Sequence, residues 1–114
     1  MPFIDLKTTA KITADNETRL RADFGKIIEL IPGKTERWLM LNFSDSCRMA
    51  FAGTADKDTA YISVELLGST TNAVYDKLTK AICDTVSKEL NVPYDRIYVK
   101  YAELEHWGFA GENF

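Results

Sequence analysis

Hydrophobic spacing divides the first half of the chain into a strand, a helix and a second strand. A short alternating run covers residues 3–6, and apolar residues then recur at helical spacing over 20–31. Thr13 or Asp15 can cap the start of this helix, and a Pro-Gly pair can end it. The dense apolar composition of residues 37–43 predicts a buried strand. The first half is therefore predicted to be a βαβ unit.

The second half repeats this order. Alternating residues 61–67 predict a strand, and one apolar face over 74–90 predicts a helix that begins near Thr71. Residues 96–101 close the second unit as a strand. Right-handed crossovers place both helices on the same face of a four-stranded mixed sheet. The predicted fold class is α+β, with a duplicated βαβ unit in a single domain that spans residues 1–114.

The other face of this sheet is predicted to be uncovered, and the strand at 37–43 is apolar on both sides. Its alternating side chains are Trp38 and Met40 on one side and Leu39, Leu41 and Phe43 on the other. A large apolar side chain left in water forfeits about 1.5–3 kcal/mol of burial. We therefore expect other copies of the chain to cover this face with closed symmetry. The alternative is that residues 44–59, or the segment after Leu104, fold across it.

Composition and charge narrow the classes of partner. The net charge of −3 and the absence of a basic stripe argue against nucleic acid as a partner. No apolar run approaches the roughly 20 residues that span a bilayer, and the first residues lack a signal-peptide pattern. We expect no membrane association, a cytoplasmic location, and free thiols at Cys47 and Cys83.

Cofactor and metal chemistry find little support in the sequence. His106 is the one histidine, and the two cysteines do not stand at ligand spacing from it, so no metal site is predicted. No glycine-rich phosphate loop is present, so no nucleotide cofactor is predicted. We expect His106 to be a loop or surface residue.

Pro2 is the position with the most distinctive chemistry. If Met1 is removed, the proline nitrogen becomes a secondary amine that can act as a base. An α-amino group loses its proton more readily when it is desolvated or placed beside a cation, and Lys34 can be that cation. The alternative interpretation is that Pro2 simply starts an edge strand, where proline is tolerated.

Several short motifs extend this picture along the chain: Met1-Pro2-Phe3-Ile4, Gly33-Lys34, Met49-Ala50-Phe51-Ala52-Gly53, Asp95-Arg96-Ile97-Tyr98 and Trp107-Gly108-Phe109, with Phe114 at the end. Together they resemble the macrophage migration inhibitory factor family of the tautomerase superfamily over essentially the whole chain. The resemblance implies a homotrimer of two-βαβ subunits, whose sheets form a central barrel with active sites at the subunit interfaces. It also implies catalysis without a cofactor.

The resemblance assigns roles to individual residues. Pro2 would be the base that moves a proton between the oxygen and the carbon of a phenylpyruvate-type 2-keto acid. Lys34 would bind the substrate carboxylate, and the backbone amide of Leu67 would face the substrate. Tyr98 would come from the neighbouring subunit, while Lys100 replaces an asparagine at the rim of the vertebrate site. The residues expected to line an aromatic-sized pocket are Phe3, Leu104, Phe109 and Phe114.

Two other functions stay open at the level of sequence. The first is a secreted, cytokine-like signalling protein that binds a protein receptor, has a vestigial or ligand-binding pocket, and leaves the cell by a non-classical route. The second is a dehalogenation or decarboxylation that uses the same base, although the chain lacks an arginine pair near Pro2.

Overall fold

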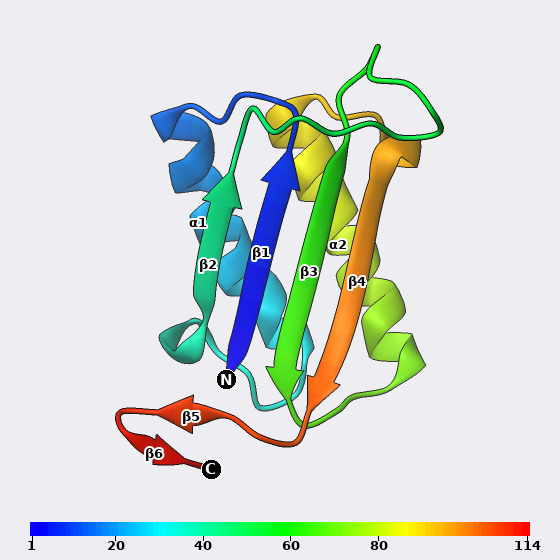
Figure 1. The fold of residues 1–114 in the computed structure, drawn as a ribbon. Helices are drawn as coiled ribbons and strands as arrows, with labels where there is room; N and C mark the ends of the chain where they lie inside the picture. Colours follow the sequence, from blue (N-terminus) through cyan, green and yellow to red (C-terminus); the bar gives the residue numbers. More distant parts are fainter.

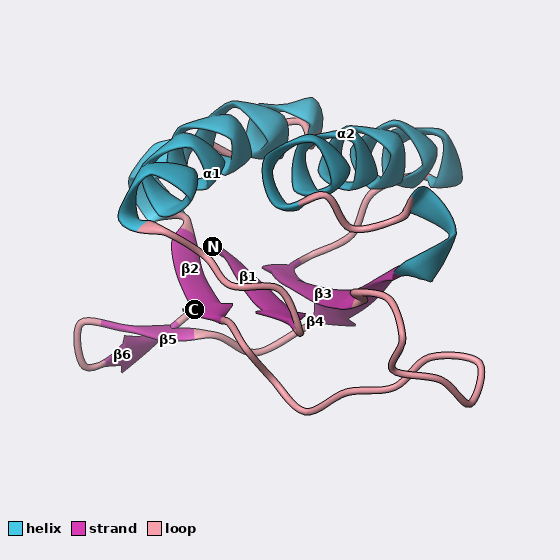
Figure 2. Cartoon of the chain, turned by 90° about the horizontal axis from the view of Figure 1, so that it is seen from above, coloured by secondary structure: helices cyan, strands magenta, loops and turns pink.

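Four strands form one sheet in the order β2-β1-β3-β4 in the computed structural model, which describes residues 1–114. Strands β1 and β2 are parallel, β3 and β4 are parallel, and β1 joins the two pairs by running antiparallel to β3. Helices α1 and α2 lie together on one face (Figure 2). These elements confirm the duplicated βαβ fold. Their bounds are β1 Pro2–Thr8, α1 Ala14–Ile27, β2 Met40–Ser44, β3 Ala60–Leu67, α2 Asn72–Leu90 and β4 Ile97–Leu104.

Both helices begin at the threonines that the sequence indicated. The Thr13 hydroxyl accepts a hydrogen bond from the Asn16 backbone N–H at 3.1 Å, and the Asn16 side chain accepts one from the Thr13 N–H at 3.2 Å. This reciprocal capping box satisfies two N–H groups that the first turn of α1 leaves unpaired. The Thr71 hydroxyl caps α2 without this reciprocal bond, by accepting from the Val74 N–H at 3.3 Å. Asn91 ends α2 in a left-handed conformation, with φ 56°.

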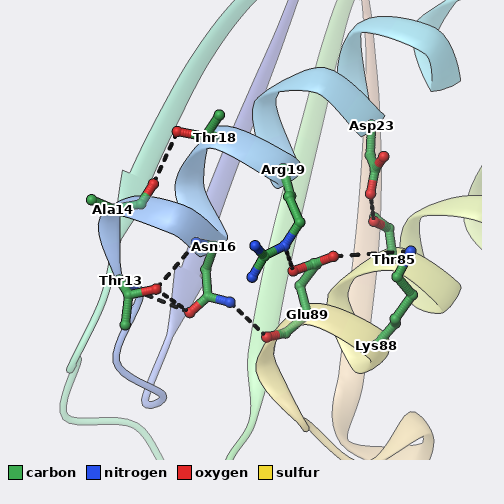
Figure 3. Close-up of polar contacts among 9 residues, drawn as sticks. All are labelled: Thr13, Ala14, Asn16, Thr18, Arg19, Asp23, Thr85, Lys88 and Glu89. Atoms are coloured by element: carbon green, nitrogen blue, oxygen red, sulfur yellow. Dashed lines mark hydrogen bonds and ion pairs between the residues drawn. The ribbon is translucent and has the colours of Figure 1, made fainter.

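Polar contacts lock α1 against α2 (Figure 3). The Arg19 Nε donates to Glu89 Oε1 at 2.7 Å, and the Thr85 hydroxyl donates to the Asp23 carboxylate at 2.5 Å. The Asn16 side chain also donates to the Glu89 carbonyl at 3.2 Å. These contacts join residues more than sixty positions apart, so they hold the first and middle turns of α1 against the C-terminal half of α2.

The core lies between the helices and the sheet and contains 18 buried apolar residues. Along β1, Ile4 and Leu6 point into this core, whereas Phe3 and Asp5 point to the opposite face. Cys83 is buried, Cys47 is half-buried, and neither forms a disulfide, which confirms the two free thiols.

The predicted strand over 37–43 is wrong at its start. Glu36–Trp38 form a short 3₁₀ turn, η2, in which the Leu39 N–H donates to the Glu36 carbonyl at 3.1 Å. The Glu36 carboxylate lies against Gly25 of α1, at a point where any side chain would collide with it. Apolar composition alone cannot distinguish this turn from a strand, and β2 begins only at Met40.

The prediction that the open sheet face is apolar is also wrong. Asp5 and Asn42 occupy its middle, and Lys7 stands nearer the end of β1; the Lys7 Nζ and Asn42 Nδ2 both donate to the Asp5 carboxylate, at 2.5 and 2.9 Å. Met40 is 67% exposed and Tyr98 is 62% exposed nearer the ends of the strands. An apolar cover is therefore not required over the centre of this face.

Neither segment proposed as an internal cover lies across the open face. Figure 1 looks onto that face: the segment between β2 and β3 passes over the ends of the strands, and the C-terminal segment lies beyond their opposite end. The C-terminal segment forms a hairpin of two short strands, β5 (Gly108–Phe109) and β6 (Glu112–Asn113). The open face is uncovered within the single chain.

Arg96 organises the long segment that precedes β3. Its buried guanidinium donates to the backbone carbonyls of Asp58, Thr54 and Lys57 at 3.0–3.2 Å, and more weakly to that of Phe51 at 3.4 Å. The guanidinium also lies over the Phe51 ring, 5.4 Å from its centroid. One side chain at the start of β4 therefore satisfies four backbone acceptors of a loop without regular structure.

We expect Arg96→Ala to lower the free energy of unfolding by about 2–4 kcal/mol, because it leaves several loop carbonyls without donors and opens a cavity. Urea unfolding followed by circular dichroism measures this change. Arg48→Ala is the matched control, since Arg48 is exposed in the same loop and makes no ion pair. Equal stabilities for the two variants would contradict the structural role given to Arg96.

Candidate functional site

A cleft of about 480 Å³ opens at the end of the sheet where β1 begins. Pro2 is buried at this end, paired with Leu66 of β3, and the C-terminal hairpin lies at the same end (Figure 1). The lining is mainly apolar and includes four aromatic side chains. Its residues are Met1, Pro2, Phe3, Arg37, Trp38, Leu39, Met40, Glu65, Trp107, Gly108 and Phe109.

Lys34 and Leu67 meet the N-terminus from two other segments. The Lys34 Nζ donates to the Leu67 carbonyl at 2.8 Å, and the Leu67 N–H donates to the Met1 carbonyl at 3.2 Å. Burial, followed by the charge of Lys34 and its hydrogen bond, lowers the pKa of the N-terminal amine of Met1 below its ordinary value. Gly33, with φ +82°, supplies the turn that brings Lys34 back towards β3. An amine that loses its proton readily therefore lies beside a cation.

The aromatic wall of the cleft comes from two segments far apart in sequence. The Trp38 ring meets Phe109 edge to face, with centroids 5.3 Å apart, and Phe109 stacks on Phe114 at 6.4 Å. The Phe114 N–H donates to the Trp107 carbonyl at 2.9 Å, which closes the hairpin. The hairpin thus places a stacked aromatic pair against the turn that precedes β2.

Five of the residues singled out from sequence meet at this cleft. Pro2, Phe3 and Phe109 line it, and Lys34 and Leu67 adjoin it through the Met1 backbone. Phe114 supports the wall from behind Phe109, and Leu104 lines a neighbouring hollow that includes Leu67. These positions bring together a base candidate, a cation and an aromatic surface.

Tyr98 and Lys100 do not meet Pro2 within the chain. Tyr98 pairs with Tyr61, which lies opposite Lys7, so it stands at the far end of the sheet from Pro2. Its ring instead packs on Phe51 at 5.1 Å. Lys100 pairs with Ser63 and stands level with Asp5, near the middle of the open face. In a single protomer neither side chain belongs to the cleft.

Arg37 and Glu65 line the cleft, but the sequence did not predict them as site residues. Trp38 was predicted to lie in a strand, whereas it lies in the 3₁₀ turn η2. The signal for Arg37 and Trp38 was the unbroken polar run over 34–37, which is typical of a turn before a strand rather than of the strand itself. Glu65 gives no such signal, because its position at the cleft depends on strand register opposite Phe3.

Other kinds of site find no support in the structure. No group of three or more His, Cys, Asp and Glu side chains could hold a metal ion. His106 is exposed, as expected. No helix is sufficiently long and apolar to cross a bilayer.

Comparisons with known proteins agree on one family. The sequence profile described as macrophage migration inhibitory factor matches residues 1–114. A macrophage migration inhibitory factor from Xenopus laevis is 26% identical, over all of this chain and 99% of its own length. The structure of Leishmania major MIF2 has a TM-score of 0.92 and 32% identity, covering 100% of this chain and 97% of its own.

A more distant structure shares the fold. The macrophage migration inhibitory factor-like protein of Entamoeba histolytica has a TM-score of 0.86 at 18% identity, covering 99% of this chain and 98% of its own. The profile match extends over the same residues that build the sheet, both helices and the cleft. The chain therefore belongs to the macrophage migration inhibitory factor family.

Proposed function

We propose that the protein is a cofactor-independent keto–enol tautomerase that acts on phenylpyruvate-type 2-keto acids, with Pro2 as its general base after removal of Met1. One observation carries the proposal: Pro2 lines a cleft with aromatic walls and directly follows the Met1 amine, whose pKa is lowered by burial and by the neighbouring Lys34. Membership of a family whose superfamily includes many tautomerases supports it.

Proton transfer by Pro2 needs a neutral amine. Once Met1 is cleaved, the Pro2 nitrogen changes from a non-basic amide to a secondary amine at the start of β1. Burial and Lys34 lower the pKa of the Met1 amine one residue earlier, and we infer that they act on the Pro2 amine in the same direction and favour its uncharged form. This amine takes the proton from the enol oxygen of the substrate and returns one to the adjacent carbon, which yields the keto acid and regenerates the base.

Removal of Met1 also changes the hydrogen bonding at Leu67. The Leu67 N–H donates to the Met1 carbonyl while Met1 is present, so cleavage deprives this amide of its acceptor. A donor at the edge of the cleft is then free for an oxygen of the substrate. Lys34 remains close by, where its ammonium group can pair with the substrate carboxylate.

The remaining walls suit an aryl group. Phe3 and Phe109 line the cleft, and Phe114 holds Phe109 from behind. Offset or edge contacts with these rings stabilise a bound aromatic ring while the carboxylate keeps a charged partner. Leu104, in the adjoining hollow, extends the apolar surface.

A homotrimer completes this site. Tyr98 and Lys100 lie on the open sheet face, away from the Pro2 of their own chain, so they can reach a cleft only in a neighbouring copy. Proteins of this fold family generally form oligomers. We infer that the neighbouring subunit contributes Tyr98 to each cleft and places Lys100 at its rim.

A signalling role is the second candidate. The Xenopus laevis relative bears a name that describes inhibition of macrophage migration, which favours a secreted, receptor-binding function for this chain as well. Under this alternative, mutations of the exposed surface should weaken binding to a protein receptor and leave catalytic turnover unchanged.

Pro2→Gly should lower the rate of phenylpyruvate ketonisation by about 100-fold, because a positioned general base contributes roughly 10²–10⁴ in rate. The measurement is enol absorbance against time, after intact mass has shown that Met1 is absent from both proteins. A sample that retains Met1 should be inactive, since its proline nitrogen is an amide. Equal rates for the wild type and Pro2→Gly would remove the role given to this nitrogen.

Lys34→Ala should raise KM for phenylpyruvate by about tenfold, through loss of the carboxylate partner. It should also move the acidic limb of the pH–rate profile to higher pH. Lys34 lowers the pKa of the Met1 amine, and we expect the same effect on the Pro2 amine once Met1 is gone. Removal of Lys34 should therefore raise the pKa of the Pro2 amine, so that the base becomes protonated sooner as the pH falls. Lys77→Ala is the matched control, because Lys77 is exposed on α2. An unmoved limb and an unchanged KM would leave Lys34 without a role.

Mixed trimers test the contribution of the neighbouring subunit. Pro2→Gly and Tyr98→Phe should each be weakly active alone, whereas refolding them together in equal amounts restores about one quarter of wild-type activity under random assembly into closed trimers. The restored sites combine an intact Pro2 with an intact Tyr98 from the adjacent copy. Activity equal to the mean of the two variants would place both residues in one chain.

A further inference from the structure

Arg37 gives the cleft a cation that the proposed proton transfer does not use. Arg37 and Trp38 are consecutive residues of the 3₁₀ turn η2, and both line the cleft with Pro2. In a strand they would point to opposite faces, but the turn brings them together. The guanidinium carbon lies 4.8 Å from the centroid of the indole ring.

The hydrogen-bond donors of Arg37 are unoccupied. Arg19 pairs with Glu89 and Arg96 donates to backbone carbonyls, whereas Arg37 takes part in none of the four ion pairs. A guanidinium stacked on an aromatic ring uses its flat face, and its N–H groups in the plane of the group stay available. This geometry suits a bidentate bond to a carboxylate.

The support beneath Arg37 is fixed by tertiary contacts. The Trp38 ring meets Phe109 of the C-terminal hairpin edge to face, so the indole cannot turn freely. The guanidinium that lies on it is therefore held at the aromatic wall on which we propose that the substrate ring rests. Preorganisation of this kind lowers the entropy lost when the cation binds a ligand.

The two cations approach Pro2 from opposite sides of β1. The Lys34 Nζ is held by the Leu67 carbonyl at the end of β3, whereas Arg37 lies on the turn that leads into β2. Strand β1 separates β2 from β3. Arg37 makes no ion pair, so it is available for a second acidic group on a ligand whose first carboxylate binds Lys34.

We propose that Arg37 is a specificity-determining residue that binds a second carboxylate on the substrate ring, so that the site prefers aryl 2-keto diacids over phenylpyruvate. This inference rests on the tautomerase function proposed above. Glu65 lines the same cleft and is not paired with Arg37. Its negative charge opposes a diacid, so Glu65 limits the preference that Arg37 creates.

The preference is measured as the kcat/KM for 4-carboxyphenylpyruvate divided by that for phenylpyruvate. Arg37→Gln should lower this ratio by about tenfold, and Glu65→Gln should raise it by a few-fold, because a charged hydrogen bond is lost in one variant and a repulsion in the other. Arg48→Gln, outside the cleft, should leave the ratio unchanged. A ratio that Arg37→Gln does not alter, with phenylpyruvate turned over normally, would overturn the inference while the proposed function stands.

Binding of unreactive acids separates the two proposals. If neither keto acid is turned over, the tautomerase function is wrong, but Arg37 can still be tested by calorimetric titration of 4-carboxyphenylacetate and phenylacetate. The diacid should bind the wild type more tightly than the monoacid, and Arg37→Gln should abolish that difference. Equal affinities in the wild type, or a difference that survives in Arg37→Gln, would refute the role of Arg37.

Discussion

Hydrogen bonding of β1 on both of its sides is the constraint on which the site depends. This strand joins the two βαβ units, because β2 pairs along one side of it and β3 along the other. A central strand cannot shift its register by one residue without turning its core residues to the open face. The first residues of the chain, which would otherwise fray, are therefore held at a fixed place beside Lys34 and Leu67.

Much of the fold could be predicted from sequence because its signals are local. Thr13 and Thr71 mark helix starts through their own hydroxyl groups, and the apolar face of α2 repeats regularly from Leu78 to Leu90. The start of β2 was predicted wrongly, since the 3₁₀ turn there depends on hydrogen bonds between neighbouring residues. Apolar composition does not carry this information.

The wrong start of β2 also affected a second prediction, namely that an apolar open sheet face drives self-association. Assigning Trp38 to a strand made both sides of that strand look apolar, and self-association then followed from burial alone. The actual face carries Asp5 at its centre, bonded to Lys7 and Asn42, so burial of apolar surface supports assembly less than expected. The better argument for assembly is geometric, because Tyr98 stands at the end of the sheet away from Pro2.

The residues of the candidate site also differ in whether the sequence could predict them. Pro2 and Lys34 could be named because their chemistry, together with the family resemblance, marks them in the sequence. Arg37 and Glu65 could not, since each is placed by a turn or by strand pairing that only the folded chain reveals. Residues that set specificity often act through their position and charge rather than through unusual reactivity, and the fold rather than the sequence then identifies them.

The dependence of the loop before β3 on Arg96 has a consequence for how the protein is made. The acceptors of this guanidinium lie between 38 and 45 positions earlier in the chain, so they are synthesised well before their donor. Domains emerge from the ribosome N-terminal part first, at about 5–20 residues per second. The carbonyl groups of the nascent loop therefore lack their Arg96 donor, and the loop stays accessible to chaperones and proteases, until the last long strand has been translated.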